Sequence, residues 1–311
     1  MRILAAIAVA LALLIAALVA ATWAPDRPVE QLKARWAPPP SVFLDIVGMK
    51  VHLRDEGPRD DPSPIVLIHG TSASLHTWEG WAQALKARRR VIRFDLPGFG
   101  LTGPAPDGRY TIESYVQVTS AVLDKLGVRR FVIGGNSLGG NVAWACALAL
   151  PARVDKLILV DAAGYPLAST SVPIGFRLAR MPLVNRLLEF SLSRGLIEAS
   201  VKNVYGDPDK VTSELVDRYY ELTLGEGNRR ALLRRFEQAD FGAQAQRIPE
   251  LKLPTLILWG GRDGLIPPSD AEHFQRDIAG SERVMFAELG HVPHEEDPAR
   301  TVAAVERFLG R

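Results

Sequence analysis

Residues 134–140, Gly-Gly-Asn-Ser-Leu-Gly-Gly, constrain the fold of this chain more than any other segment. They follow a short apolar run at residues 131–133 and precede a helical pattern at residues 142–148. The glycines two positions before and after Ser137 suit a tight crossing from strand to helix, where a Cβ atom would collide with backbone. The pattern therefore predicts that Ser137 lies on a sharp turn between a buried strand and a helix.

A serine on such a turn has a chemical use. Its hydroxyl stands clear of the sheet edge, and the following helix directs backbone N–H groups and the positive end of its dipole toward it. The backbone N–H of Leu138 would then face an oxyanion formed at Ser137. The motif indicates a nucleophile at Ser137, while a glycine-rich turn without chemistry remains the alternative on this evidence alone.

The rest of the chain alternates between patterns typical of strands and of helices. Short, mostly apolar strands are predicted at residues 65–68, 91–94, 131–133, 156–160, 255–259 and 283–286, and helices at residues 78–87, 112–126, 142–150 and 301–309. Strands that are apolar on both faces are typical of a parallel sheet covered by helices. A hairpin is expected earlier, over residues 41–54. We therefore predict an α/β fold with a mostly parallel central sheet flanked by helices.

The strand pattern is interrupted once. From residue 165 to residue 248 only helical patterns occur, which predicts an inserted helical domain between two parts of an α/β core, residues 41–164 and 249–311. Residues 25–40 are rich in proline and are expected to form a tether. A short amphipathic stretch within this tether fits either a membrane surface or the surface of the domain, and the sequence does not decide between them.

The first residues form a separate unit. No charged residue occurs from residue 3 to residue 23, a length that gives about 31 Å of helix at 1.5 Å per residue. Residues 1–24 are therefore predicted to be an uncleaved membrane anchor, with Trp23 near the interface and the rest of the chain on the extracytoplasmic side. The alternative is a signal peptide followed by secretion, although its apolar core is usually about 7–15 residues long.

Composition excludes several classes of function. The formal net charge of +2 shows no electrostatic footprint for nucleic acid. A single cysteine excludes an internal disulfide framework and a cysteine-based metal site, and the six histidines lack the spacing of metal ligands. No cofactor motif occurs, so neither a cofactor nor a metal is expected. The oligomeric state is not determined by the sequence.

Four motifs, taken in chain order, resemble the α/β-hydrolase fold family over nearly all of residues 41–311. They are His69-Gly70-Thr71, the Asp-Leu-Pro-Gly-Phe-Gly stretch at residues 95–100, the turn at Ser137, and Gly290-His291. The resemblance implies that the inserted helices at residues 165–248 form a cap over the site. It also implies a catalytic triad in the order serine, acid, histidine.

His291 is the expected base. It follows a predicted strand, and the Gly290-His291 pair matches the histidine loop of the family. His294 is the local competitor, but no glycine precedes it. His69 is expected to support the oxyanion loop structurally, because that is its place in the family.

The expected acid is Asp263. It directly follows the strand at residues 255–259 and lies 28 residues before His291, where the acid of the family usually falls. Asp161 also lies at a strand end, a position that some relatives use instead. Asp95 belongs to a turn motif and is expected to be structural.

Two backbone N–H groups are expected to form the oxyanion hole. Leu138 supplies one through the turn geometry. The resemblance assigns the second to Thr71, with Ser72 as the alternative if the loop is shifted by one residue. A serine at position 137 also argues against dehalogenases and epoxide hydrolases of this fold, which the resemblance says carry aspartate there.

These residues predict a serine hydrolase that cleaves a small-molecule or lipid-like carboxylic ester through an acyl-enzyme. One alternative is a C–C bond hydrolase of vinylogous diketone acids, because that branch often has asparagine before the serine, as at Asn136. Against it, His291 is followed by Val292 where that branch often has tryptophan. The chain also lacks the branch's glycine-rich oxyanion loop. Acyl transfer to an acceptor other than water, and a catalytically silent lipid-binding module, also remain open.

Four arginines stand close together in the inserted segment: Arg229, Arg230, Arg234 and Arg235. We expect this run to form a solvated face of a helix. Binding to an anionic lipid surface is the alternative.

Overall fold

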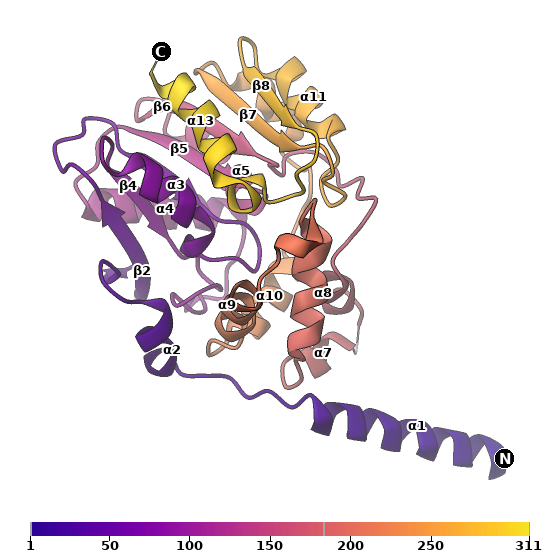
Figure 1. Cartoon of the computed structure of the whole chain (residues 1–311). Helices are drawn as coiled ribbons and strands as arrows, with labels where there is room; N and C mark the ends of the chain where they lie inside the picture. Colours follow the sequence, from indigo (N-terminus) through magenta and orange to yellow (C-terminus); the bar gives the residue numbers. More distant parts are fainter. Residues whose placement is uncertain (1, 183, 311) are drawn as a thin grey trace.

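The computed structural model describes residues 2–182 and 184–310, and its centre is an eight-stranded sheet (Figure 1). The strand order is β1-β2-β4-β3-β5-β6-β7-β8. The strands are β1 (Val42–Ile46), β2 (Met49–Glu56), β3 (Ile65–Ile68), β4 (Val91–Phe94), β5 (Phe131–Asn136), β6 (Val154–Val160), β7 (Thr255–Gly260) and β8 (Glu282–Phe286). The pairs β1–β2 and β2–β4 are antiparallel, and all other pairs are parallel. The predicted α/β fold with a mostly parallel sheet is confirmed.

Helices cover both faces of the sheet because its strands are apolar on both sides. In β3, Val66 and Ile68 belong to one core cluster, whereas Ile65 and Leu67 belong to the other, as the alternation of side chains along a strand requires. The first face carries α4 (Ile112–Lys125), α5 (Leu138–Ala149) and α11 (Ser269–Asp277). The second carries the short helix η1 (Leu75–Trp78), α3 (Glu79–Leu85) and α13 (Pro298–Leu309).

Only helices and loops occur between β6 and β7 in the part of this segment that the structure describes. They are α6 (Ile174–Ala179), α7 (Val184–Leu188), α8 (Arg194–Val204), η2 (Pro208–Lys210), α9 (Ser213–Thr223), α10 (Asn228–Glu237) and η3 (Ala245–Glu250). Figure 1 shows α7 to α10 gathered on one side of the sheet. That this segment acts as a cap over a site remains a prediction.

The proline-rich segment is not extended throughout. It contains α2 (Val29–Trp36), which follows Pro28 and packs on the body of the protein. Leu32 and Trp36 are buried in a cluster with Leu101 and Leu222. The sequence did not decide whether this stretch lies on a membrane surface or on the surface of the domain, and the structure places it on the domain.

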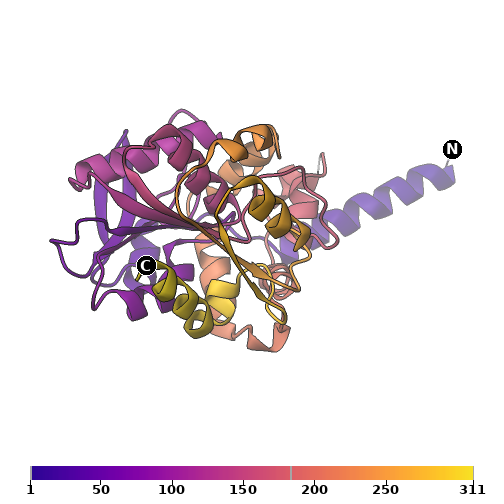
Figure 2. The same cartoon turned by 90° about the horizontal axis from the view of Figure 1, so that it is seen from above.

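The first helix, α1 (Arg2–Ala21), extends away from the body in both views (Figures 1 and 2). Several of its apolar side chains are exposed, including those of Ile3, Leu4, Leu13 and Leu14. By length and hydropathy, no helix in the described part of the chain qualifies as a membrane span. The predicted membrane anchor at residues 1–24, and the extracytoplasmic location that depends on it, are therefore not supported.

Trp23, which we expected near a membrane interface, contacts the inserted helices instead. Its ring stacks on that of Phe190 with centroids 6.0 Å apart. The next residue, Ala24, donates its backbone N–H to the carbonyl of Phe190 at 3.0 Å. The chain just after α1 is thus tied to the connection between α7 and α8.

Candidate active site

Ser137 lies on the predicted turn between β5 and α5. Its backbone has φ 55° and ψ −118°, a strained conformation for a residue with a side chain. A Cβ atom at Gly135 would lie 2.0 Å from the carbonyl oxygen of Gly139, and one at Gly139 would lie 2.1 Å from that of Ile68. Glycine is therefore required at both positions, because only a hydrogen atom fits between Gly135 and the start of α5 and between Gly139 and strand β3.

His291 and Asp263 form a buried pair. The ring nitrogen Nδ1 of His291 lies 2.7 Å from Oδ2 of Asp263, and because a carboxylate accepts, Nδ1 donates. The other oxygen of Asp263 accepts the backbone N–H groups of Leu265 and Ile266, at 2.8 and 3.0 Å. The carboxylate is thus held from both sides, and the Nε2 nitrogen of His291 is left as the proton acceptor.

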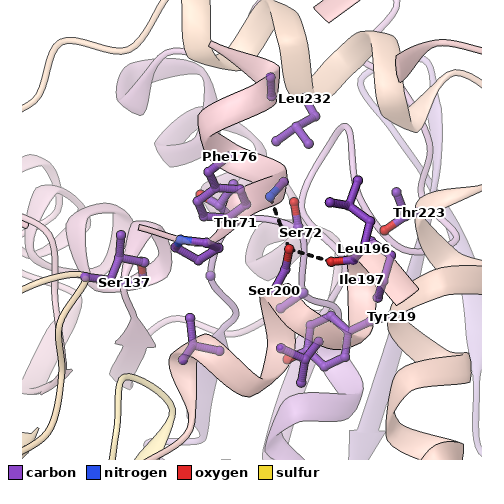
Figure 3. Close-up of a pocket in the computed structure, with 18 of the residues that line it drawn as sticks. Thr71, Ser72, Ser137, Phe176, Leu196, Ile197, Ser200, Tyr219, Thr223 and Leu232 are labelled. Atoms are coloured by element: carbon purple, nitrogen blue, oxygen red, sulfur yellow. Dashed lines mark hydrogen bonds between the residues drawn. The ribbon is translucent and has the colours of Figure 1, made fainter. Parts of the chain in front are cut away.

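Ser137 and His291 line the same large cavity (Figure 3). The cavity has a volume of about 990 Å³, is partly open to solvent and is also lined by Thr71. Most of its other lining side chains are apolar and come from the inserted helices; they include Phe176, Leu188, Leu192, Leu196, Ile197 and Leu232. In Figure 3 Ser137 lies on one side of the cavity and Ile197 and Tyr219 on the other. The hydroxyl of Ser137 thus faces a space that suits an apolar group.

His69 has a structural role in the oxyanion loop. Its Nε2 accepts the backbone N–H of Leu96 at 2.9 Å, and its Nδ1 donates to the carbonyl of Gly70 at 2.7 Å. Complete burial lowers the pKa of the imidazole, so the ring is neutral. Both nitrogens are occupied, and the ring orients the peptide just before Thr71. The other predicted donor, Leu138, begins α5 and lines a second cavity together with Thr71 and Ser137.

Asp161, the alternative acid, lies at the end of β6 with φ 43°. One of its carboxyl oxygens accepts the backbone N–H of Gly260 at 2.9 Å. Burial, followed by the nearby carboxylate of Asp263, raises the pKa of Asp161 well above its usual value. The hydrogen bond to His291 is made by Asp263, and Asp161 is a buried carboxyl group beside the pair.

Side-chain ligand atoms of Asp161, Asp263 and His291 lie within 4.8 Å of one another, a spacing that a metal ion can use. The Nδ1 nitrogen of His291, however, carries the proton that it donates to Asp263. His291 and Asp263 are therefore engaged with each other through this hydrogen bond, and Asp161 accepts the backbone N–H of Gly260.

Three residues to which the sequence analysis assigned no structural role hold the histidine loop. Asn136, which is 2% exposed, donates through Nδ2 to the carbonyls of Val160 and His291, at 3.1 and 2.9 Å. Glu296 accepts the backbone N–H of Gly290 at 2.8 Å and those of Gly206 and Asp207, both at 2.9 Å. Glu295 forms an ion pair with Arg218 of α9. Only the position of Asn136 before the serine gave a signal in the sequence.

His294, the local competitor for the base, is packed elsewhere. It is fully buried, and its ring lies over that of Trp78 with centroids 4.0 Å apart. Its Nε2 contacts Thr77 Oγ1 at 3.0 Å, and burial lowers its pKa well below the usual value. It does not line the cavity of Ser137.

The arginine run of α10 differs from our expectation. Arg230 and Arg234 are exposed, but Arg229 and Arg235 are only 5% and 6% exposed. Arg229 pairs with Asp26 at 2.6 Å. The prediction of a wholly solvated face is wrong for the two buried arginines, because α10 packs against the body along the side that carries them.

Comparison with known proteins agrees with this architecture. The family model described as alpha/beta hydrolase fold matches residues 63–298. A protein of Mycobacterium tuberculosis, known only as an uncharacterized protein, is 32% identical over 297 residues, covering 91% of this chain and 84% of the relative. The 2-hydroxy-6-oxo-2,4-heptadienoate hydrolase of Pseudomonas putida is 27% identical, covering 84% and 93%.

Solved structures give the same result. A meta-cleavage product hydrolase from Pseudomonas fluorescens is 25% identical with a TM-score of 0.74, over 87% of this chain and 97% of that one. A membrane phospholipase A is 25% identical with a TM-score of 0.76, over 99% and 96%. With a family model that matches most of the chain, and the strand order and helices described above, this protein belongs to the α/β-hydrolase fold family.

Proposed function

We propose that the protein is a serine hydrolase that acts through an acyl-enzyme on Ser137. The observation that carries the proposal is the buried pair of His291 and Asp263, whose histidine lines the same cavity as Ser137. A serine hydroxyl needs such an oriented base to attack a carbonyl carbon. The reaction is one of bond cleavage with water as the final acceptor.

In this mechanism Nε2 of His291 takes the proton of Ser137 as its oxygen attacks the substrate carbonyl. The backbone N–H groups of Thr71 and Leu138 stabilise the resulting oxyanion. His291 then gives the proton to the leaving group, and water, activated by the same imidazole, releases the acyl group from Ser137. Asp263 keeps the imidazole in the required tautomer throughout.

The first candidate reaction is cleavage of a C–C bond in a vinylogous diketone acid. The curated relatives with assigned activities in P. putida and in Pseudomonas sp. are named for this chemistry, as is a solved structure at 25% identity. In such a substrate the bond between the attacked carbonyl carbon and the dienol fragment breaks. The proton from His291 goes to the departing carbon, and the acyl fragment remains on Ser137.

The second candidate reaction is hydrolysis of a carboxylic ester. It is favoured by the mostly apolar lining of the large cavity, which suits an alkyl or acyl chain. The likeness to a membrane phospholipase A over 99% of this chain supports it as well. The proton from His291 then goes to the alcohol oxygen instead of to carbon.

Two substrate sets distinguish the candidates in the full-length protein. The first is 2-hydroxy-6-oxohepta-2,4-dienoate, followed by the loss of its dienol absorbance, and the second is a p-nitrophenyl ester series from acetate to palmitate. Ser137→Ala is expected to lower kcat at least about 10³-fold on whichever substrate is turned over. Ser120→Ala on α4 serves as the control and should leave kcat unchanged.

Labelling with a fluorophosphonate covers the remaining alternatives. Labelling of Ser137 without turnover of either set would favour acyl transfer to another acceptor. Failure of Ser137 to react at all would contradict the proposal and favour a silent binding module.

A further inference from the structure

Arg235 is a buried cation without a carboxylate partner. It lies on α10, is 6% exposed, and its Nε has no hydrogen-bond partner among the residues that the structure describes. None of the ion pairs found within residues 2–182 and 184–310 involves Arg235. A buried charge is costly unless it is paired, so an unpaired guanidinium in a protein interior calls for an explanation.

A second arginine lies beside it. The guanidinium carbon of Arg180 is 5.0 Å from the ring centroid of Phe241, and that of Arg235 is 5.9 Å from the same centroid. Arg180 also lies 5.0 Å from the centroid of Phe236. Stacking on a ring offsets part of the cost of burying a guanidinium, yet it leaves the N–H groups at the edge free to donate. Arg235 therefore has a buried donor without an acceptor among the described residues, whereas Arg180, which is exposed, adds a second guanidinium group beside it.

Both arginines line a second, smaller cavity that also reaches Ser137. Its volume is about 570 Å³, and its lining includes both proposed oxyanion donors, Thr71 and Leu138. Asp240, which is exposed, lies at the same cavity. Ser137 is thus located where the large, mostly apolar cavity, which has Arg229 in its lining, meets a smaller one lined by two arginines.

We propose that the smaller cavity is a subsite for a carboxylate carried by the acyl part of the substrate, with Arg235 and Arg180 as its ligands. The inference rests on the second candidate reaction, ester hydrolysis, and names its substrate class. Two guanidinium groups and the carboxylate of Asp240 leave a net charge of one positive unit. A monoanion neutralises that charge, whereas a phosphate dianion would exceed it.

The position of the histidine assigns the subsite to the acyl side. His291 lines the large cavity and not the smaller one. The leaving group must receive its proton from His291, so it occupies the large cavity, where its apolar part fits the lining. The part of the substrate that remains on Ser137 then extends toward Arg235.

A matched pair of esters tests the subsite in the full-length protein. Monohexyl succinate and hexyl butyrate share the alcohol and differ in whether the acyl chain ends in a carboxylate or a methyl group. In the wild-type protein kcat/KM is expected to be at least about tenfold higher for the succinate. Arg235→Gln should lower the succinate-to-butyrate ratio about 10–100-fold, the range expected for a lost charged hydrogen bond, mainly through KM.

Three further variants separate recognition from folding. Arg235→Lys keeps the charge and should retain part of the ratio, and the exposed neighbour Arg234→Gln should leave it unchanged. Asp240→Asn removes the repulsion and should raise the ratio, a gain that misfolding cannot produce. Equal turnover of both esters by the wild-type protein, or an unchanged ratio in both Arg235→Gln and Asp240→Asn, would overturn the subsite.

Binding of the two esters to the Ser137→Ala variant tests the subsite without any need for ester hydrolysis. Titration calorimetry should show tighter binding of monohexyl succinate than of hexyl butyrate, and adding Arg235→Gln should remove the difference. If this difference is present but neither ester is hydrolysed by the wild-type protein, ester cleavage fails while the subsite stands. If the difference is absent, the subsite fails whatever the reaction.

Discussion

Two aspartates at the ends of neighbouring strands differ in their hydrogen-bond partners. Asp263 follows β7 and accepts two backbone N–H groups and the N–H of His291 Nδ1. Asp161 ends β6 and is fully buried, and burial, followed by the nearby carboxylate of Asp263, raises its pKa well above the usual value. Only Asp263 therefore holds the imidazole of His291.

This difference predicts that substitution by asparagine lowers kcat strongly at position 263 and only slightly at position 161. Asp263→Asn removes the acceptor that holds His291 in its tautomer and is expected to lower kcat about 10⁴-fold. Asp161→Asn keeps the shape of the side chain and leaves the hydrogen bond between Asp263 and His291 in place, so it should change kcat less than about tenfold. Steady-state kinetics on whichever substrate is turned over measures kcat of both variants. A greater loss of kcat for Asp161→Asn than for Asp263→Asn would mean that Asp161 orients His291.

Asp161 also predicts how stability depends on pH. Burial raises its pKa in the folded state, so the folded protein binds this proton more tightly than the unfolded chain does. The contribution of Asp161 is complete below the unfolded pKa of about 3.9 and is lost as the pH rises through the folded pKa. The melting temperature of Asp161→Asn minus that of the wild-type protein should therefore increase between pH 4 and pH 8. Thermal unfolding at several pH values measures this difference, and a constant value would contradict the raised pKa of Asp161.

At the scale of elements, the turn at Ser137 depends on the close approach of β3, β5 and α5. Backbone atoms fill the space where side chains would begin at Gly135 and Gly139. Neither contact involves the flexible end of a side chain, so neither can relax by a rotamer change. The strained φ of Ser137 is maintained by this packing.

Gly135→Ala should consequently prevent correct packing of the turn. Because the new Cβ would lie 2.0 Å from a backbone oxygen, we expect a loss of about 4–5 kcal/mol in the free energy of unfolding, or failure to fold. Gly195→Ala on α8 is the matched control, since no atom lies within 4 Å of its Cβ position. There the higher helix propensity of alanine should add up to about 1 kcal/mol. Urea unfolding compares the two, and a mild effect at Gly135 would show that the turn has room to adjust.

At the scale of the whole molecule, the N-terminal segment links distant parts of the chain. The Nε1 of Trp36 donates to Glu221 of α9 at 2.6 Å, and Arg35 pairs with the same carboxylate at 2.9 Å. Farther along the segment, Asp26 pairs with Arg229 of α10. Residues 24–36 therefore fasten the inserted helices to the core near β1, which positions the walls of the large cavity.

Trp36→Ala tests this link. Trp36 is 7% exposed, and removal of a buried aromatic side chain usually costs about 3–5 kcal/mol. Trp23, which is 58% exposed and contacts the ring of Phe190, provides a control of the same residue type. Its replacement by alanine should cost less than about 1.5 kcal/mol. Chemical denaturation of both variants gives the comparison, and equal costs would mean that α2 contributes little to the folded state.

The sequence by itself determined the fold class and the principal motifs. Apolar strands at regular intervals require a sheet that is covered on both faces, and the glycines around Ser137 permit only a tight turn there. These patterns are local, so they can be recognised in the sequence without knowledge of distant contacts. The proposed roles of Ser137, His291 and Asp263 rest on the same local patterns and on the resemblance of their order to a known family.

Only the tertiary structure decided how residues distant in the sequence meet. The pairing of His291 with Asp263 rather than with Asp161 depends on the loop after β7, and the packing of Trp36 depends on α9. The arginine run of α10 looked uniformly polar, yet Arg229 and Arg235 are buried and Arg230 and Arg234 are exposed. Which side of α10 is covered depends on how the helix packs, and the sequence of the run does not show that. Burial and the pairing of charges are properties of the assembled molecule, and a linear pattern of residue types does not contain them.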